Sequence, residues 1–165
     1  MAKNCILNAD QSALRIRRIA FQIYESNTDV DEIVVAGIMS SGFKLAEEIA
    51  RVLTEITPIK VVCCQVNINK KALLEPISTS LKASDYRDKS LVLIDDVLNS
   101  GKTLAYGVRH FLEVPLKRFK TVVLINRNHK NYPVKADFKG LSLSTSLHEH
   151  VEVIHSDKGF EAYLT

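Results

Sequence analysis

Residues Leu91 to Leu104 read LVLIDDVLNSGKTL, a stretch that joins an apolar segment, two adjacent carboxylates and a small polar turn. The run Leu91 to Ile94 is apolar without alternation, as expected of a parallel strand that is covered on both faces. Asp95 and Asp96 follow directly, and in open α/β sheets ligands bind outside the carboxyl ends of the strands. The stretch therefore predicts a buried strand, a ligand-binding edge and then a helix.

The polar turn after the two acids suits a phosphate group. Asn99, Ser100, Gly101 and Thr103 are turn and helix-capping residues, and apolar residues follow them at helical spacing. The free N–H groups of such a turn and the positive end of the helix attract an anion. A P-loop is excluded, because its spacing would need glycine at Asp96. A solvated strand end or the metal pocket of a receiver domain would explain the acids but not the adjoining turn.

A second strand-turn-helix unit precedes this one. Ile33 to Ala36 is apolar, Gly37 to Gly42 forms the turn, and Leu45, Ile49 and Leu53 mark the helix. Because parallel strands end at one edge of a sheet, the two turns would bring two phosphate-sized sites together, with the carboxylates between them. The carboxylates would accept hydrogen bonds from sugar hydroxyls and help to hold Mg²⁺. Phosphate at each end with a diol between describes 5-phosphoribosyl diphosphate.

The composition is that of an ordinary globular protein. The chain has 165 residues, 46% of them hydrophobic and 25% charged, and its net charge of +3 is too small to indicate a nucleic-acid binder by itself. Three cysteines without zinc-like spacing to histidines indicate reduced thiols rather than a disulfide framework. No apolar run reaches the roughly 18 residues of a membrane span. We expect one cytoplasmic domain over residues 1–165, without membrane contact.

The rest of the chain alternates strand-like and helix-like segments. The expected elements are a helix from Asn8 or Asp10 to about Ser26, strands over 59–66 and 121–125, and short terminal strands around 137–138, 151–154 and 160–164. Residues 67–87 show no sustained period, and so long a loop in a compact domain is usually functional or mobile. The pattern predicts an α/β fold with a mainly parallel sheet and a small terminal addition.

Two segments resemble known families. Residues 93–103 resemble the diphosphate-sugar signature of the type I phosphoribosyltransferases. Residues 124–140 are similar to the Asp-Arg-Gly-His…Leu-Pro-Ile-Arg-Ala-Asp-Tyr-Ile-Gly segment of the PyrR-type pyrimidine-operon regulators, which double as uracil phosphoribosyltransferases. The likeness covers nearly the whole chain and is weakest over 67–87. It implies the type I phosphoribosyltransferase fold, a central, mainly parallel sheet flanked by helices with a small β-rich hood.

The resemblance also implies roles for individual residues. Asp95 and Asp96 would be the catalytic residues and would hold Mg²⁺. The remaining assignments are the ribose 5-phosphate site at Val97, Asn99, Ser100, Gly101, Lys102 and Thr103 together with the two acids, the diphosphate site at Met39, Ser40, Ser41 and Gly42, and the base pocket at Arg127, Asn128 and His129. The implied partners are 5-phosphoribosyl diphosphate, a pyrimidine base or nucleotide, RNA, and further copies of this chain in a dimer or larger homo-oligomer.

Several residues depart from the family pattern. In the diphosphate turn, Ser40-Ser41 stand where the family has Thr-Arg, and Lys70-Lys71 lie in the region of its Tyr-Arg-Asp-Asp loop. In the sugar motif, Asn99 is an amide and cannot be a general base. In the second segment, Asn126 and Asn128 replace an acid and a glycine, and Leu141 replaces a basic residue that touches RNA. Three interpretations stay open: a uracil phosphoribosyltransferase, a nucleotide-sensing RNA-binding regulator with little catalysis, and a transferase for another base.

Two groups of basic residues are harder to assign. Arg15, Arg17 and Arg18 form a cluster on the first expected helix, which we interpret as a solvated face. In the family, basic residues of this helix contribute to an RNA-binding surface, so that alternative stays open. The C-terminal histidines His148, His150 and His155 have no metal-binding spacing, and we expect them to be structural or solvated.

Overall fold

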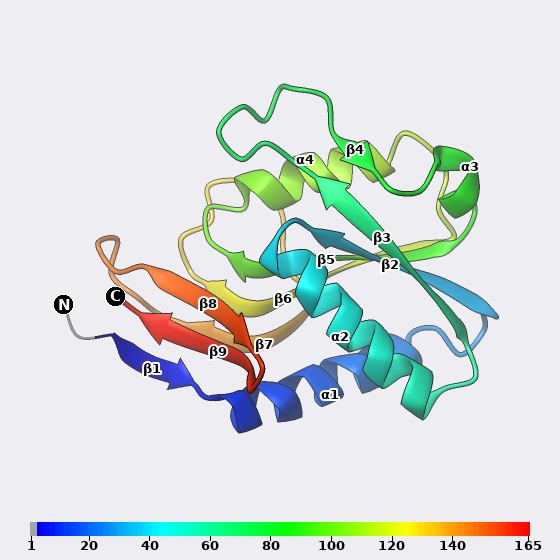
Figure 1. Ribbon diagram of the computed structural model, residues 1–165. Helices are drawn as coiled ribbons and strands as arrows, with labels where there is room; N and C mark the ends of the chain where they lie inside the picture. Colours follow the sequence, from blue (N-terminus) through cyan, green and yellow to red (C-terminus); the bar gives the residue numbers. More distant parts are fainter. Residues whose placement is uncertain (1–2) are drawn as a thin grey trace.

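The structure is a computed structural model that describes residues 3–165. Six strands form the main sheet in the order β4-β3-β2-β5-β6-β7 (Figure 1). Their bounds are β2 Glu32–Ile38, β3 Lys60–Asn67, β4 Ser78–Thr79, β5 Ser90–Leu98, β6 Arg118–Arg127 and β7 Phe138–Leu143. Neighbouring strands are parallel, except that the two-residue β4 pairs antiparallel with β3. The expected mainly parallel sheet is confirmed.

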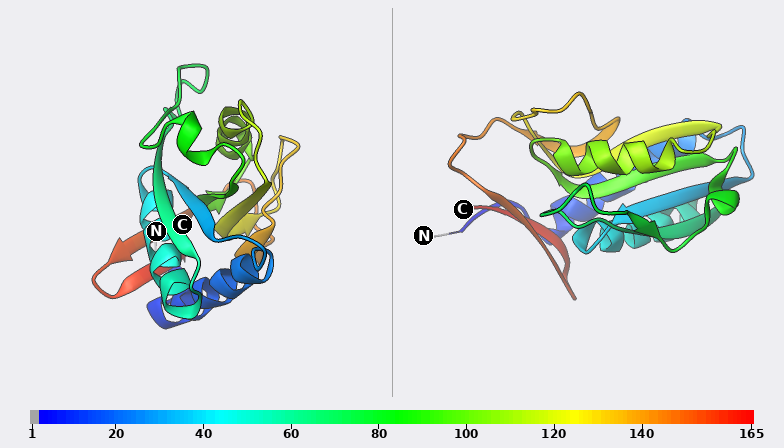
Figure 2. Two further views of the ribbon diagram at one scale, coloured as in Figure 1. Left: turned by 90° about the vertical axis from the view of Figure 1, so that its right-hand side faces the viewer. Right: turned by 90° about the horizontal axis from the view of Figure 1, so that it is seen from above.

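Helices cover both faces of this sheet (Figures 1 and 2). Helices α1 (Ala9–Glu25) and α2 (Ser41–Ile56) pack on one face, and α3 (Ala83–Tyr86) and α4 (Lys102–Phe111) pack on the other. Strand β5 serves both cores, because Val92 and Ile94 face α1 and α2 while Leu91 and Leu93 face α4. Burial on both faces explains why the run has no polar alternation.

Helix α1 begins where the sequence indicates. The side chain of Asn8 accepts a hydrogen bond from the Gln11 backbone N–H at 2.9 Å, and the Gln11 side chain accepts one from the Asn8 N–H at 3.0 Å. This reciprocal capping box satisfies two backbone donors at the start of the helix. Asn8, rather than Asp10, is therefore the capping residue.

A second sheet of three antiparallel strands forms the hood. Its order is β1-β9-β8, with β1 at Asn4–Leu7, β8 at Val151–Ser156 and β9 at Gly159–Leu164. The N-terminal strand lies beside the C-terminal one, as Figure 1 shows. The sequence predicts β8 and β9 but not β1, because four residues carry too little periodicity and their partner lies at the other end of the chain.

The expected turn over residues 37–42 is wrong in its bounds. Strand β2 continues to Ile38 and helix α2 starts at Ser41, so the connection is short and contains a cis peptide between Met39 and Ser40. A Cβ atom at Gly37 would lie 2.5 Å from Phe43 Cα, closer than real Cβ atoms approach. The glycine therefore lets the start of α2 pack directly on β2.

Strand β5 is longer than the sequence indicates. It runs through Asp95 and Asp96 to Leu98, so the two carboxylates lie near the carboxyl end of the strand, as expected. The long segment 67–87, expected as a loop, contains the short elements β4 and α3. Within residues 3–165, no helix is long and apolar enough to cross a membrane.

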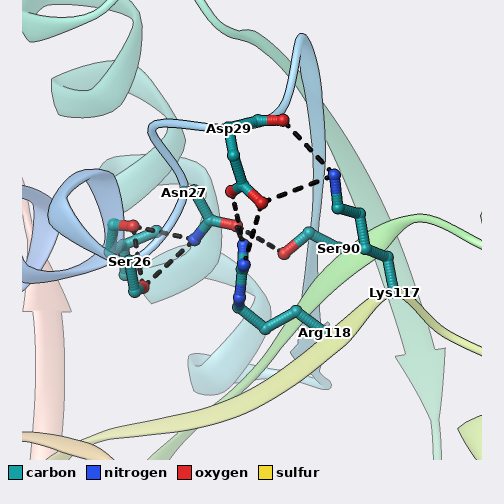
Figure 3. Close-up of polar contacts among 7 residues, drawn as sticks. Ser26, Asn27, Asp29, Ser90, Lys117 and Arg118 are labelled. Atoms are coloured by element: carbon teal, nitrogen blue, oxygen red, sulfur yellow. Dashed lines mark hydrogen bonds and ion pairs between the residues drawn. The ribbon is translucent and has the colours of Figure 1, made fainter.

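The amino ends of the strands are tied together by the polar network in Figure 3. Asn27, at the end of α1, is fully buried; its Nδ2 donates to Ile23 O at 2.8 Å, and its Oδ1 accepts from Ser90 Oγ at 2.5 Å. Arg118 of β6 donates to both carboxylate oxygens of Asp29, at 3.0 and 3.1 Å, and to Asn27 Oδ1 at 3.2 Å. This network lies at the amino ends of the parallel strands, and the candidate site lies at their carboxyl ends.

Candidate active site

The two adjacent carboxylates are oriented by the backbone of β5 itself. Asp95 Oδ1 accepts a hydrogen bond from the Asp96 N–H at 2.9 Å, and Asp96 Oδ1 accepts one from the Val97 N–H at 2.8 Å. The register between β5 and β6 is the same on both sides of Asp96, since Asp95 pairs with Val123 and Val97 with Ile125. Such side-chain to backbone bonds compete with the regular ladder and hold each carboxylate in one orientation.

Asp95 is the more buried of the two acids, at 3% exposed. Its burial, and secondarily the negative charge of Asp96, raise the pKa of Asp95 to about 8, against the opposing effect of Lys70. Lys70 Nζ lies 3.8 Å from Asp95 Oδ1 and comes from the long segment after β3. The pair of acids thus forms a site that favours a cation or hydrogen-bond donors from a ligand.

A pocket of about 240 Å³ opens beside these acids, at the start of α4. The sequence-predicted ribose 5-phosphate residues all line it, apart from Asp96, and Lys70, Leu98, Leu104 and Val123 complete the lining. Gly101 has φ +85°, and a Cβ there would meet Val134 Cγ2 at 2.7 Å. Glycine is thus required at this turn, which brings backbone N–H groups and the helix N-terminus to the pocket.

The predicted diphosphate turn lies beside the acids. Ser41 Oγ donates to Asp96 Oδ2 at 2.5 Å, which joins the start of α2 to the end of β5. A Cβ at Gly42 would lie 3.1 Å from both Asp95 Cα and Asp95 Oδ1, so this position needs a small residue. The two predicted anion turns, distant in sequence, are therefore adjacent across the carboxylate pair.

The predicted base-pocket residues face the connection between β7 and β8, residues 144–150, which we call the hood connection. Arg127 is 3% exposed and donates to Thr145 Oγ1, Ser146 O and Glu149 O at 2.9, 3.1 and 2.6 Å, and to Asn99 Oδ1 at 3.1 Å. Its guanidinium is thus engaged by the protein rather than presented to a ligand. The predicted place of Arg127 in a base pocket stays a prediction.

The neighbours of Arg127 continue the same pattern. Asn128 Nδ2 donates to Ser144 Oγ at 3.3 Å, and His129 Nε2 lies 2.5 Å from Thr145 O. Asn126 Nδ2 donates to Ser142 Oγ at 3.2 Å, while its buried Oδ1 has no hydrogen-bond partner among the described residues. The segment is aligned along the hood connection, and its role in base binding stays a prediction.

The arginine cluster of α1 is only partly a solvated face. Arg15 Nη1 donates to Gly140 O at 3.0 Å, and Arg18 Nη2 donates to Gly140 O and Lys139 O at 2.8 and 3.0 Å. These carbonyl groups belong to β7, the edge strand of the main sheet. The solvated interpretation is therefore wrong for Arg15, which is half-buried, and incomplete for Arg18.

The sequence placed Lys70 only in the region of the altered loop, and it gave no sign that residues 131–132 support the phosphate turn. The backbone N–H groups of Asn131 and Tyr132 donate to Ser100 O at 2.8 and 3.2 Å, and so hold the phosphate turn from behind. The lysine could be suspected from its charge in a long loop. The backbone contacts leave no signal in the sequence, because they depend on how two loops meet.

The fold and this site define a class of protein. Residues 4–157 match the phosphoribosyl transferase domain family. A hypoxanthine-guanine phosphoribosyltransferase from Bacillus anthracis superposes with a TM-score of 0.77 at 17% identity, covering 100% of both chains. The hypoxanthine phosphoribosyltransferase of Trypanosoma cruzi gives a TM-score of 0.78 at 15% identity, covering 98% and 96%. The protein is a type I phosphoribosyltransferase by fold and family.

Within that class, the chain is of the PyrR type. The bifunctional protein PyrR of Streptococcus agalactiae is 31% identical over 147 residues, which cover 86% of this chain and 85% of the relative. The bifunctional protein PyrR of Haemophilus ducreyi is 29% identical over 156 residues, covering 90% and 87%. The resemblance stated from residues 93–103 and 124–140 is confirmed, and the chain belongs to the PyrR-type phosphoribosyltransferases.

Proposed function

We propose that this phosphoribosyltransferase transfers the 5-phosphoribosyl group of 5-phosphoribosyl diphosphate to uracil, giving UMP and diphosphate. The observation that carries the proposal is that the two turns predicted to bind anions lie on either side of Asp95 and Asp96, joined by the contact from Ser41. Uracil is proposed from the PyrR-type resemblance of residues 124–140. The solved structures cited above are named for purine bases, so the choice of base is the point to test.

The reaction needs no covalent nucleophile from the protein. The bond from ribose C1 to the diphosphate oxygen breaks with its electron pair on the leaving group, a ring nitrogen of the base bonds to C1, and the proton of that nitrogen is released. Positive charge builds on the sugar in the transition state, and nearby carboxylates stabilise it. We assign the ribose hydroxyls to Asp95 and Asp96, the 5-phosphate to the turn 99–103, and the diphosphate to residues 39–42.

Mg²⁺ fits the donor groups present. Asp95 and Asp96 supply the hard carboxylate oxygens that this ion prefers. In the part of the chain that the structure describes, no cluster of three or more metal-ligating side chains forms. Substrate oxygens and water would therefore complete the coordination, as is usual for Mg²⁺ at phosphate sites. When bound, the ion would neutralise charge on the leaving diphosphate.

Incubation of the protein with 5-phosphoribosyl diphosphate, Mg²⁺ and each free base in turn tests the proposal. UMP should form with uracil, and product should be lost in Asp95→Asn with Asp96→Asn, because neither amide carries the negative charge that the transition state requires. The conservative Glu152→Gln change on the exposed hood serves as the control and should leave turnover unchanged. Absence of product with every base would contradict the enzyme, and product with hypoxanthine or guanine alone would contradict the pyrimidine assignment.

A second candidate is a nucleotide-sensing RNA-binding regulator with little catalysis. Ser40-Ser41 favours it, because the diphosphate turn lacks a cation that would offset the charge of the leaving group. The docking of Arg15 and Arg18 on β7 weakens it, since those guanidinium groups already have acceptors. Salt-dependent RNA binding that falls in Arg15→Ala or Arg18→Ala, without nucleotide synthesis, would favour this alternative. A cytoplasmic location and a homo-oligomer stay predictions.

A further inference from the structure

Arg127 is a buried cation whose hydrogen bonds run to two separate parts of the molecule. It is the last residue of β6. On one side, Nη1 reaches Asn99 Oδ1 in the phosphate turn at 3.1 Å. On the other side, Nε and Nη2 reach the hood connection through Thr145, Ser146 and Glu149. One planar guanidinium therefore joins the phosphate turn to the hood connection, a geometry that lysine does not reproduce.

The contact also decides how the Asn99 amide is presented. Asn99 is exposed and lines the pocket, and its oxygen accepts the hydrogen bond from Arg127. An amide carries its two N–H donors on the other atom, so the nitrogen is the polar end left for a ligand. A donor suits the oxygens of a phosphate or a ribose, whereas a carbonyl oxygen in the same place would repel them.

We propose that Arg127 is a positioning residue that fixes Asn99 with its amide donor available to ribose 5-phosphate and couples the phosphate turn to the hood connection. The inference rests on the proposed function, because it assigns a role within the phosphoribosyl site. Arg127 is not among the residues that line the pocket, so it acts through Asn99 rather than by touching the ligand. Because Arg127 is buried, the loss of one hydrogen-bond acceptor would leave one of its N–H donors unsatisfied. This cost holds the guanidinium in one orientation.

Calorimetric titration of the full chain with ribose 5-phosphate tests the coupling, because binding requires neither the base nor catalysis. The proteins compared are the wild type, Arg127→Lys, Asn99→Ala and the double variant. Each single change should weaken ribose 5-phosphate binding about tenfold. Arg127→Lys removes the charge-assisted hydrogen bond that orients Asn99, and Asn99→Ala removes the oriented amide itself. The double variant should also lose about tenfold rather than a hundredfold, since both changes remove the same interaction.

A matched control separates positioning from general stability. Arg118→Lys changes another arginine that makes several hydrogen bonds, but this one lies at the amino ends of the strands. The change should leave ribose 5-phosphate affinity unchanged. Additive losses in the double variant, or wild-type affinity in Arg127→Lys, would overturn the inference. Failure of the wild type to bind ribose 5-phosphate would instead overturn the proposed function on which the inference depends.

Asn99→Asp keeps the test decisive even if Arg127→Lys does not fold. The aspartate retains an oxygen that accepts from Arg127 but has no donor for the ligand. It should therefore be at least as thermally stable as Asn99→Ala and bind ribose 5-phosphate no better than that variant. Wild-type affinity in Asn99→Asp would show that the amide donor has no role and would overturn the assignment.

Discussion

Asp95 is a carboxyl group held in a place that disfavours its charge. It is 3% exposed, lies beside Asp96, and has its pKa raised to about 8 by burial and by that neighbour. A carboxyl with a raised folded-state pKa stabilises the fold below its unfolded pKa of about 3.9, and this contribution is lost as pH rises toward the folded value. The binding site is therefore built at a cost to the stability of the unliganded protein.

We predict that Asp95→Asn stabilises the unliganded protein by an amount that grows with pH. The amide has the same shape and no charge to desolvate, so the advantage should increase by on the order of 3 kcal/mol between pH 5 and pH 8. Urea unfolding of both proteins across this range measures the difference. The exposed Glu152→Gln variant should show no such trend, and parallel curves for Asp95→Asn and wild type would contradict the prediction.

At the scale of elements, the start of α2 is positioned by glycine rather than by a long turn. A Cβ at Gly37 would meet backbone, Phe43 Cα at 2.5 Å and Gly42 O at 2.6 Å, so only a shift of the helix would relieve the clash. At Gly107 the nearest atom is the tip of a flexible side chain, Leu93 Cδ2 at 3.0 Å. The two glycines are both buried but differ in whether backbone or a flexible side chain would have to move.

Gly37→Ala should destabilise the protein by about 3 kcal/mol and weaken diphosphate binding, because α2 begins with Ser41 and Gly42 of the diphosphate turn. Gly107→Ala should change stability by less than about 1 kcal/mol, since the gain in helix propensity offsets a small rearrangement. Chemical denaturation gives both values, and titration with inorganic diphosphate gives the functional effect. Equal costs for the two changes would show that the backbone clash is not what distinguishes them.

At the scale of the whole molecule, the polar network of Figure 3 and the candidate binding site lie at opposite ends of the parallel strands. The network of Asn27, Asp29, Ser90 and Arg118 joins the end of α1 to the starts of β5 and β6, as Figure 3 shows. The hydrogen bond from Arg118 lowers the pKa of Asp29 to about 2. This lowered pKa means that the ion pair stabilises the fold above the unfolded pKa and that its contribution disappears as pH falls toward 2.

Asp29→Asn should therefore lower stability at neutral pH, while its difference from the wild type shrinks as pH falls below about 4. The effect should be small, because the Asp29 side chain is 53% exposed and solvent screens the pair. Denaturation at pH 7 and about pH 2.5 measures the two differences. Ribose 5-phosphate affinity should not change. A loss of affinity would contradict the separation of the Asp29 network from the binding site.

Much of the fold could be predicted from local patterns. The apolar run before Asp95, the helical spacing after Thr103 and the cap at Asn8 are short-range signals, and the structure confirms each of those elements. The missed strand β1 and the misplaced ends of β2 and β5 depend on pairing with distant residues, which leaves little trace in four to nine residues of sequence. The PyrR-type family was likewise identifiable from two motifs.

The sequence by itself determined the α/β class, the two turns and the acids between them, because backbone propensity, apolar periodicity and glycine or capping positions act over a few residues. Tertiary structure alone decided that Ser41 meets Asp96, that Lys70 comes within 3.8 Å of Asp95, and that Arg127 bonds both Asn99 and the hood connection. These contacts join segments far apart in the chain. Their geometry follows from how the sheet, helices and hood pack together, and no local rule encodes it.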